Sequence, residues 1–207
     1  MATITNTAAT MAVNKAEINT PIYSDVDGVV LNFSAGFYAF MAAEFGVLAT
    51  EPEPMNFDYS DVFRDIDMPA KHIKKFICES EFFASLPPYA DSFDAISLLS
   101  SAGVVVNFIT SIKCSSHSEA ARTNNLNKLF LAPQKITCLD LSACKSDALR
   151  SLPPGVFVDD QPSVCERVAE LNLHKVFLMD RRYNQRHLPE SVTRIKSLFE
   201  LPHFIQL

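Results

Sequence analysis

The chain has 207 residues, of which 48% are hydrophobic and 20% are charged; this composition predicts one globular domain with a substantial core and a small insert. Its net charge of -6 argues against a protein that holds a nucleic-acid polymer, because no surplus of basic groups exists to replace the counterions of the backbone. Small anions stay open as substrates, since one local positive site is enough to bind them.

Features of the whole sequence place the protein in the cytoplasm. No apolar run approaches the roughly 20 residues that a membrane-spanning helix needs, so no membrane partner is expected. The five cysteines are an odd number without a C-x-x-C pair, and we expect most of them to be reduced and packed. Whether the chain forms a homodimer is left open.

The first 33 residues divide into a tail and the start of a folded core. Residues 1–19 are small and polar without an amphipathic period, and we expect a disordered tail there. A transit peptide is the alternative, although such peptides are usually rich in arginine and this stretch contains none. A short apolar strand through Ile22 and Tyr23 then begins the core.

A helical insert is expected between this strand and the rest of the core. Apolar residues recur at helical spacing from Phe33 to Phe45, with Ser34 as the predicted N-cap and Gly46 as the predicted stop. Prolines then break the chain, and a further helical stretch lies around residues 70–77. We expect residues 34–88 to form a small helical cap, inserted after the first strand.

The remaining sequence alternates between helical and strand patterns. We expect helices over 91–102, 116–130, from 144, over 163–171 and over 191–198, and strands over 104–109, 135–138, 155–158 and 175–179. This alternation predicts the α/β class, with a Rossmann-like, doubly wound parallel sheet. Its core comprises residues 20–33 and 89–207.

Polar residues follow three of the apolar strands. These residues are, in chain order, Asp25 with Asp27, Thr110 with Ser111, and Asp159 with Asp160. In open α/β sheets the ligand site lies beyond the carboxyl ends of the strands, so these side chains are expected to converge. Facing carboxylates repel each other, and a hard divalent cation relieves that repulsion through oxygen ligands. The pattern therefore predicts a magnesium site.

Carboxylates, magnesium, hydroxyl groups and a lysine together suit a phosphate monoester. Asp25 can attack phosphorus to give an aspartyl-phosphate, and Asp27 can protonate the leaving oxygen and then deprotonate water. Taken alone, D-x-D-G is also a common turn sequence. A calcium loop starting at Asp25 is excluded, because its fifth and twelfth positions are Val29 and Gly36, which offer no side-chain oxygen.

The sequence resembles the haloacid dehalogenase-like phosphohydrolase superfamily. The resemblance rests on Asp25-Val26-Asp27-Gly28, Thr110, Lys145 and Asp159-Asp160, in this order and context. Lys145 is preferred over Lys135 for the third motif, because it begins a helix that leads into the last acidic strand. The resemblance implies that Asp25 is the nucleophile, Asp27 the acid/base, and Thr110 and Lys145 the phosphoryl ligands. It implies a magnesium ion held by Asp25, the Asp27 carbonyl and Asp160, with Asp159 as a support or further ligand.

Within that superfamily the sequence is most similar to the 5'(3')-deoxyribonucleotidases. Similar stretches are residues 25–33 (DVDGVVLNF), 82–95 (FFASLPPYADSFDA) and 110–113 (TSIK). The resemblance implies that Phe33 stacks against a base and that Ser111 and Lys113 help to bind substrate. The family sequence Thr-Ser-Pro-Ile-Lys is one residue longer, so Lys113 comes one position early.

Three hypotheses for function follow. The first is a magnesium-dependent 5'-nucleotidase that dephosphorylates nucleoside monophosphates through an aspartyl-phosphate. The second keeps the chemistry but acts on a sugar phosphate or another small phosphoester. The third is a non-catalytic protein that binds a ligand or partner on the same fold.

Overall fold

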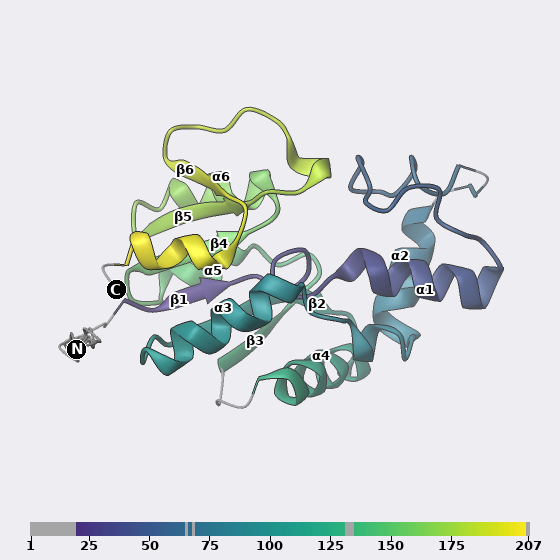
Figure 1. The fold of residues 1–207 in the computed structure, drawn as a ribbon, viewed down its shortest axis with the longest axis horizontal. Coiled ribbons are helices and arrows are strands. Elements are labelled where there is room, and N and C mark those ends of the chain that lie inside the picture. Colours follow the sequence, from purple (N-terminus) through teal and green to yellow (C-terminus); the bar gives the residue numbers. More distant parts are fainter. Residues whose placement is uncertain (1–19, 65, 68, 131–134, 206–207) are drawn as a thin grey trace, which may run out of the picture.

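A computed structural model describes residues 20–64, 66–67, 69–130 and 135–205. These residues form a six-stranded parallel sheet in the order β3-β2-β1-β4-β5-β6 (Figure 1). The strands are β1 (Ile22–Ser24), β2 (Val106–Lys113), β3 (Lys135–Asp140), β4 (Gly155–Asp159), β5 (His174–Met179) and β6 (Val192–Ile195). The α/β class and the parallel doubly wound sheet are confirmed.

The strand order creates a crevice at the centre of the sheet. The chain runs outward from β1 through β2 to β3, and then returns to the other side of β1 for β4. Ser24 is therefore paired with Phe108 on one side and with Val158 on the other. Such a reversal leaves a ligand crevice beyond the carboxyl ends of the two central strands.

Alternate residues of each strand enter two separate apolar cores, as the period of two requires. Ile22 and Phe108 face one core, which contains apolar side chains of α3 (Ala90–Ser101) and α4 (Ser116–Leu129). Their neighbours Tyr23 and Ile109 face the other, with side chains of α5 (Lys145–Arg150) and α6 (Pro162–Ala169). The central strands are thus buried on both sides, which explains their continuous apolar sequences.

Two further helices extend beyond the sheet: α1 (Phe33–Phe45) and α2 (Pro69–Glu79) (Figure 1). We call residues 34–88 the insert. Phe37 of α1 packs against Phe76 of α2, with ring centroids 5.5 Å apart, and both rings are fully buried. A 3-10 helix, Phe83–Ser85, then leads back toward α3. The division into core and cap stays a prediction.

Helix α1 ends as predicted but begins differently. Gly46 adopts the left-handed conformation (φ 67°) and caps the helix, in agreement with the sequence. The N-cap is Asn32 rather than Ser34, because the Oδ1 atom of Asn32 accepts the Ala35 N–H at 3.0 Å. Ser34 is instead buried, with its hydroxyl 3.0 Å from that of Tyr59.

The predicted helix over residues 191–198 is wrong. This segment forms β6, which pairs with β5 from Val192 to Ile195, followed by a 3-10 helix, Leu198–His203. Its β-branched residues fit a sheet, and the open edge of β5 provides the hydrogen-bond partners. Strand β2 also continues past Thr110 and Ser111 to Lys113, with a register shift against β3 after Ser111.

The prediction for the cysteines holds for three of the five. Cys138, Cys144 and Cys165 are free, whereas Cys78 and Cys114 form a disulfide. This disulfide joins α2 of the insert to the loop that follows β2, across 36 residues of sequence. Five cysteines without a C-x-x-C spacing do not predict which two of them form a disulfide.

The tail predicted for residues 1–19 lies outside the described residues. Among the residues described, no helix combines the length and apolar character that crossing a membrane requires.

Candidate active site

Most of the predicted site residues converge at the central crevice. Asp25 follows β1, and its N–H donates to the Val158 carbonyl of β4 at 2.8 Å. A pocket of about 410 Å³ opens at this point between the core and the insert. Asp25, Asp27, Thr110, Lys145 and Asp160 all line it.

The loop after β1 is folded tightly, so that both aspartates face the pocket. The Val26 carbonyl accepts the N–H groups of Val30 and Leu31, each at 2.8 Å. Gly28 has a φ of +79°, and a side chain at this position would collide with the Asp160 carboxylate. Glycine therefore meets two needs here: the left-handed conformation and the close approach of the neighbouring strand end.

A lysine bridges the two acidic strand ends. The Nζ atom of Lys145, the first residue of α5, lies 2.7 Å from Oδ1 of Asp25 and 2.8 Å from Oδ2 of Asp159. All three side chains are buried. Burial opposes the charge on the lysine, but the two carboxylates raise the pKa of Lys145 above its ordinary value. Lys135 lies instead at the start of β3, outside the pocket lining.

Burial dominates the electrostatics of Asp25. Loss of solvent raises the pKa of Asp25 to about 7, against the opposing effect of the Lys145 ammonium. Burial, with the neighbouring charges of Asp159 and Asp25, also raises the pKa of Asp160 well above its ordinary value. The centre thus holds more negative charge than one lysine compensates.

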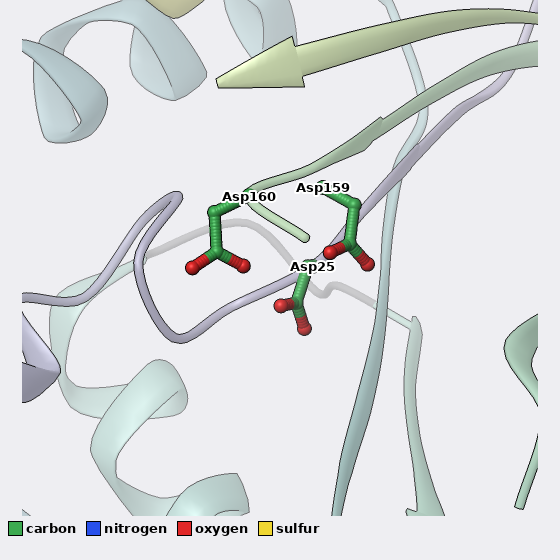
Figure 2. A group of neighbouring side chains, drawn as sticks. All are labelled: Asp25, Asp159 and Asp160. Atoms are coloured by element: carbon green, nitrogen blue, oxygen red, sulfur yellow. The ribbon is translucent and has the colours of Figure 1, made fainter. Parts of the chain in front are cut away.

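Three carboxylates meet in a geometry that suits a hard cation. Oxygens of Asp25, Asp159 and Asp160 lie within 4.8 Å of one another, and Figure 2 shows them together at the strand ends. Both oxygens of Asp159 are already engaged, Oδ2 by Lys145 and Oδ1 by the Gln161 N–H at 2.8 Å, whereas the Lys145 contact at Asp25 is to Oδ1. Asp25 and Asp160 are therefore the better candidates for direct ligands. An all-oxygen donor set with excess negative charge fits Mg²⁺.

The other predicted residues have varied positions. Thr110 is buried and lines the pocket, as do Ser111 and Phe33. Asp27 also lines the pocket, with its carboxylate paired to Arg122. Lys113 is not among the lining residues: its Nζ atom lies 3.3 Å from Glu119.

Sequence patterns missed several residues that support this centre. The Tyr183 hydroxyl donates a short hydrogen bond to the Asp160 carboxylate, and the side chain of Asn184 donates to the Asp160 carbonyl at 2.7 Å. Arg181 donates to the Gly28 carbonyl at 2.7 Å, and its guanidinium lies 4.0 Å from the ring centre of Tyr89. These residues follow the end of β5. Polar residues directly after that apolar strand are the sequence feature from which they could be predicted.

Arg122 is the remaining residue that the sequence did not reveal. It lies in the middle of α4 and is fully buried beside Asp27. Nothing in its helical sequence distinguishes it from a solvated arginine, which is the usual situation.

The fold is shared with haloacid dehalogenase-like hydrolases of known structure, all at low sequence identity. A putative haloacid dehalogenase-like hydrolase from Burkholderia xenovorans is 13% identical, with a TM-score of 0.57 over 90% of this chain and 97% of that one. D,D-heptose 1,7-bisphosphate phosphatase from B. bronchiseptica, complexed with magnesium and phosphate, is 14% identical, with a TM-score of 0.55 over 90% and 98%. CbbY from Rhodobacter sphaeroides, in complex with phosphate, is 16% identical, with a TM-score of 0.56 over 91% and 99%. No protein-family model and no curated protein sequence matches the chain.

Proposed function

We propose that the protein is a magnesium-dependent phosphatase that hydrolyses a small phosphate monoester through an aspartyl-phosphate on Asp25. The observation that carries this proposal is the Lys145 bridge, which brings Asp25 and Asp159 together beside Asp160 at the edge of a pocket. The fold shared with known phosphatases supports it.

The residues of the pocket can be given distinct roles. In the first step an oxygen of Asp25 forms a bond to phosphorus, while Asp27 gives a proton to the leaving oxygen. In the second step water attacks phosphorus, the bond from phosphorus to the Asp25 oxygen breaks and releases phosphate, and Asp27 takes the proton of the water. Thr110, Ser111 and Lys145 would hold the phosphoryl oxygens.

A metal ion would be held by Asp25, Asp160 and the Asp27 carbonyl, with Asp159 as a support. When bound, Mg²⁺ would neutralise charge on the phosphoryl oxygens and so lower the repulsion between the phosphoryl group and the Asp25 carboxylate. The buried carboxylates and the Tyr183 hydrogen bond to Asp160 support this assignment.

For the substrate we propose foremost a sugar phosphate or a related small phosphoester with a single phosphate group. One of the similar structures is, by its name, a sugar bisphosphate phosphatase. Among the described residues that line this pocket, however, only Lys145 and Arg167 are basic. Lys145 is engaged at the reacting centre, which leaves Arg167 alone for any second phosphate.

A nucleoside monophosphate is the second candidate, and one observation favours it. Five aromatic side chains line the pocket, and flat rings suit a nucleobase: Phe33, Phe57, Tyr59, Tyr89 and Tyr183. Homodimerisation and a cytoplasmic location stay predictions.

A substrate panel tests the proposal. Purified protein with Mg²⁺ is expected to release phosphate from sugar monophosphates faster than from sugar bisphosphates, and faster deoxynucleoside monophosphate turnover would favour the second candidate. Asp25→Asn is expected to abolish turnover, because its amide is not a nucleophile. Asp94→Asn, on the exposed face of α3, is the matched control and should keep full activity. A fully active Asp25→Asn variant contradicts the mechanism, and an inactive wild type favours a non-catalytic binding protein.

A further inference from the structure

A buried guanidinium lies directly behind Asp27. Arg122 comes from α4, and its side chain is completely buried. Its Nη2 atom lies 2.6 Å from Oδ1 and 2.8 Å from Oδ2 of Asp27. Asp27 borders the pocket and Arg122 does not, so the carboxylate separates the guanidinium from the substrate space.

Packing alone does not account for an arginine in this position. Among the described residues, Asp27 is its one acidic partner, and its Nε and Nη1 atoms have no hydrogen-bond partner. Its guanidinium carbon lies 4.3 Å from the ring centre of Phe83, which is also fully buried. Burying a charge with incomplete hydrogen bonding is costly, and an apolar side chain of similar volume often serves stability equally well.

The helix that carries Arg122 is held firmly. Ser115 caps its N-terminus by accepting the Ser118 N–H at 3.2 Å. Near its middle, the Asn125 side chain donates to the Leu86 carbonyl, at the end of the insert, at 3.2 Å. The position of the guanidinium is therefore set by a capped helix that is also tied to the end of the insert.

We infer that Arg122 is a positioning residue, which fixes the plane and direction of the Asp27 carboxylate so that it faces the scissile ester. This inference rests on the proposed function. One nitrogen contacts both oxygens, and each carboxylate oxygen has two lone pairs. A lone pair on each oxygen therefore stays available for proton transfer on the pocket side.

The two half-reactions show where positioning matters. When Asp25 bonds to phosphorus, the bond from phosphorus to the leaving oxygen breaks, and Asp27 gives that oxygen its proton. When water later releases phosphate from Asp25, Asp27 receives the proton of the water. An alkoxide leaving group needs the first proton transfer, whereas nitrophenolate leaves without it.

The experiment compares kcat/KM for an alkyl phosphate and for p-nitrophenyl phosphate, with Mg²⁺, in the wild type, Arg122→Met and Arg122→Lys. Only steps up to the first bond cleavage enter kcat/KM. Arg122→Met is expected to lower the alkyl phosphate value about 100-fold while the nitrophenyl value changes by less than about 3-fold, because general acid catalysis contributes at least 100-fold. Arg122→Lys keeps the charge but not the planar geometry, so its kcat/KM for the alkyl phosphate should lie between those of the wild type and Arg122→Met.

Two controls separate positioning from a merely structural role. Arg186→Met removes a surface pair with Glu166, at 2.7 Å, and should leave the ratio of the two kcat/KM values unchanged. Asp27→Asn/Arg122→Met removes both buried charges and should match the ratio of Asp27→Asn alone. If Arg122→Met alone does not fold, the comparison of the double variant with Asp27→Asn still tests whether Arg122 acts through Asp27.

The inference is overturned if Arg122→Met lowers kcat/KM equally for both esters, or for neither. It is also overturned if the double variant has a lower kcat/KM for the alkyl phosphate than Asp27→Asn alone. A wild type that hydrolyses neither ester, although folded, overturns the proposed function and this inference together. A wild type that hydrolyses both, with an inactive Asp25→Asn, leaves the proposed function intact whatever Arg122 does.

Discussion

Without metal, the protein should become less stable as the pH rises from about 4 to about 7, and the Asp25→Asn variant should remove the part of this effect that Asp25 contributes. Buried Asp25 keeps its proton up to a pKa of about 7, compared with 3.8 for an ordinary aspartate. The folded state therefore binds more protons than the unfolded state across this window, and stability falls as the pH rises. Below the window both states are protonated and no stability is lost.

The magnitude follows from the size of the shift. A pKa difference of roughly three units corresponds to about 4 kcal/mol, as an upper limit, between the two ends of the window. Mg²⁺ should cancel the loss, since a cation at Asp25 and Asp160 favours the ionised carboxylates. Proton release then accompanies metal binding, and the affinity for Mg²⁺ should rise with pH through the same window.

Urea unfolding followed by circular dichroism measures this effect, at about pH 5 and about pH 8, in EDTA and in Mg²⁺. The relevant quantity is the difference in unfolding free energy between wild type and Asp25→Asn, because titrating groups that Asp25 does not influence cancel in it. In EDTA the Asp25→Asn variant should become more stable relative to the wild type as the pH rises. In Mg²⁺ this relative gain should be smaller. A difference that stays constant with pH, or the same trend in both solutions, would refute the reasoning.

Two further variants probe the contacts around the site. Cys78→Ser should lower the free energy of unfolding by about 4 kcal/mol under oxidising conditions, because the disulfide to Cys114 closes a 36-residue loop; Cys138→Ser is the matched control, and midpoints in urea that do not differ would contradict the expectation. Tyr183→Phe should weaken Mg²⁺ binding about 10-fold or more, because Asp160 loses the hydroxyl that orients it. Calorimetric titration with Mg²⁺ measures the second effect, and an unchanged affinity would rule it out.

Local patterns predicted the sheet and the acidic centre well, because both depend on short-range signals. Apolar strands that end in Asp25 and Asp159 mark the same edge of any parallel sheet, so their approach follows from topology. Residues 192–195, predicted as part of a helix over 191–198, form a strand because pairing with β5, a contact with another part of the chain, decides their conformation.

Other features depend on three-dimensional contacts that local patterns do not carry. Arg122 reaches Asp27 across 95 residues, and an arginine in a polar helix ordinarily indicates a solvated face. The Cys78–Cys114 pairing likewise arises only when the insert folds against the core.

Tyr183 contacts both Asp160 and the insert, so its ring connects the proposed metal site with the insert. Its hydroxyl binds Asp160, while Phe57 of the insert packs against the ring in a T-shaped arrangement, with ring centroids 5.6 Å apart. Beside it, Arg182 pairs with Glu51 of the insert at 3.6 Å. If a cation at Asp160 holds this ring in place, it also holds the surface that Phe57 of the insert contacts. Such coupling is reciprocal, so a ligand that favours this contact raises the affinity for the cation by the same factor by which the cation raises the affinity for that ligand.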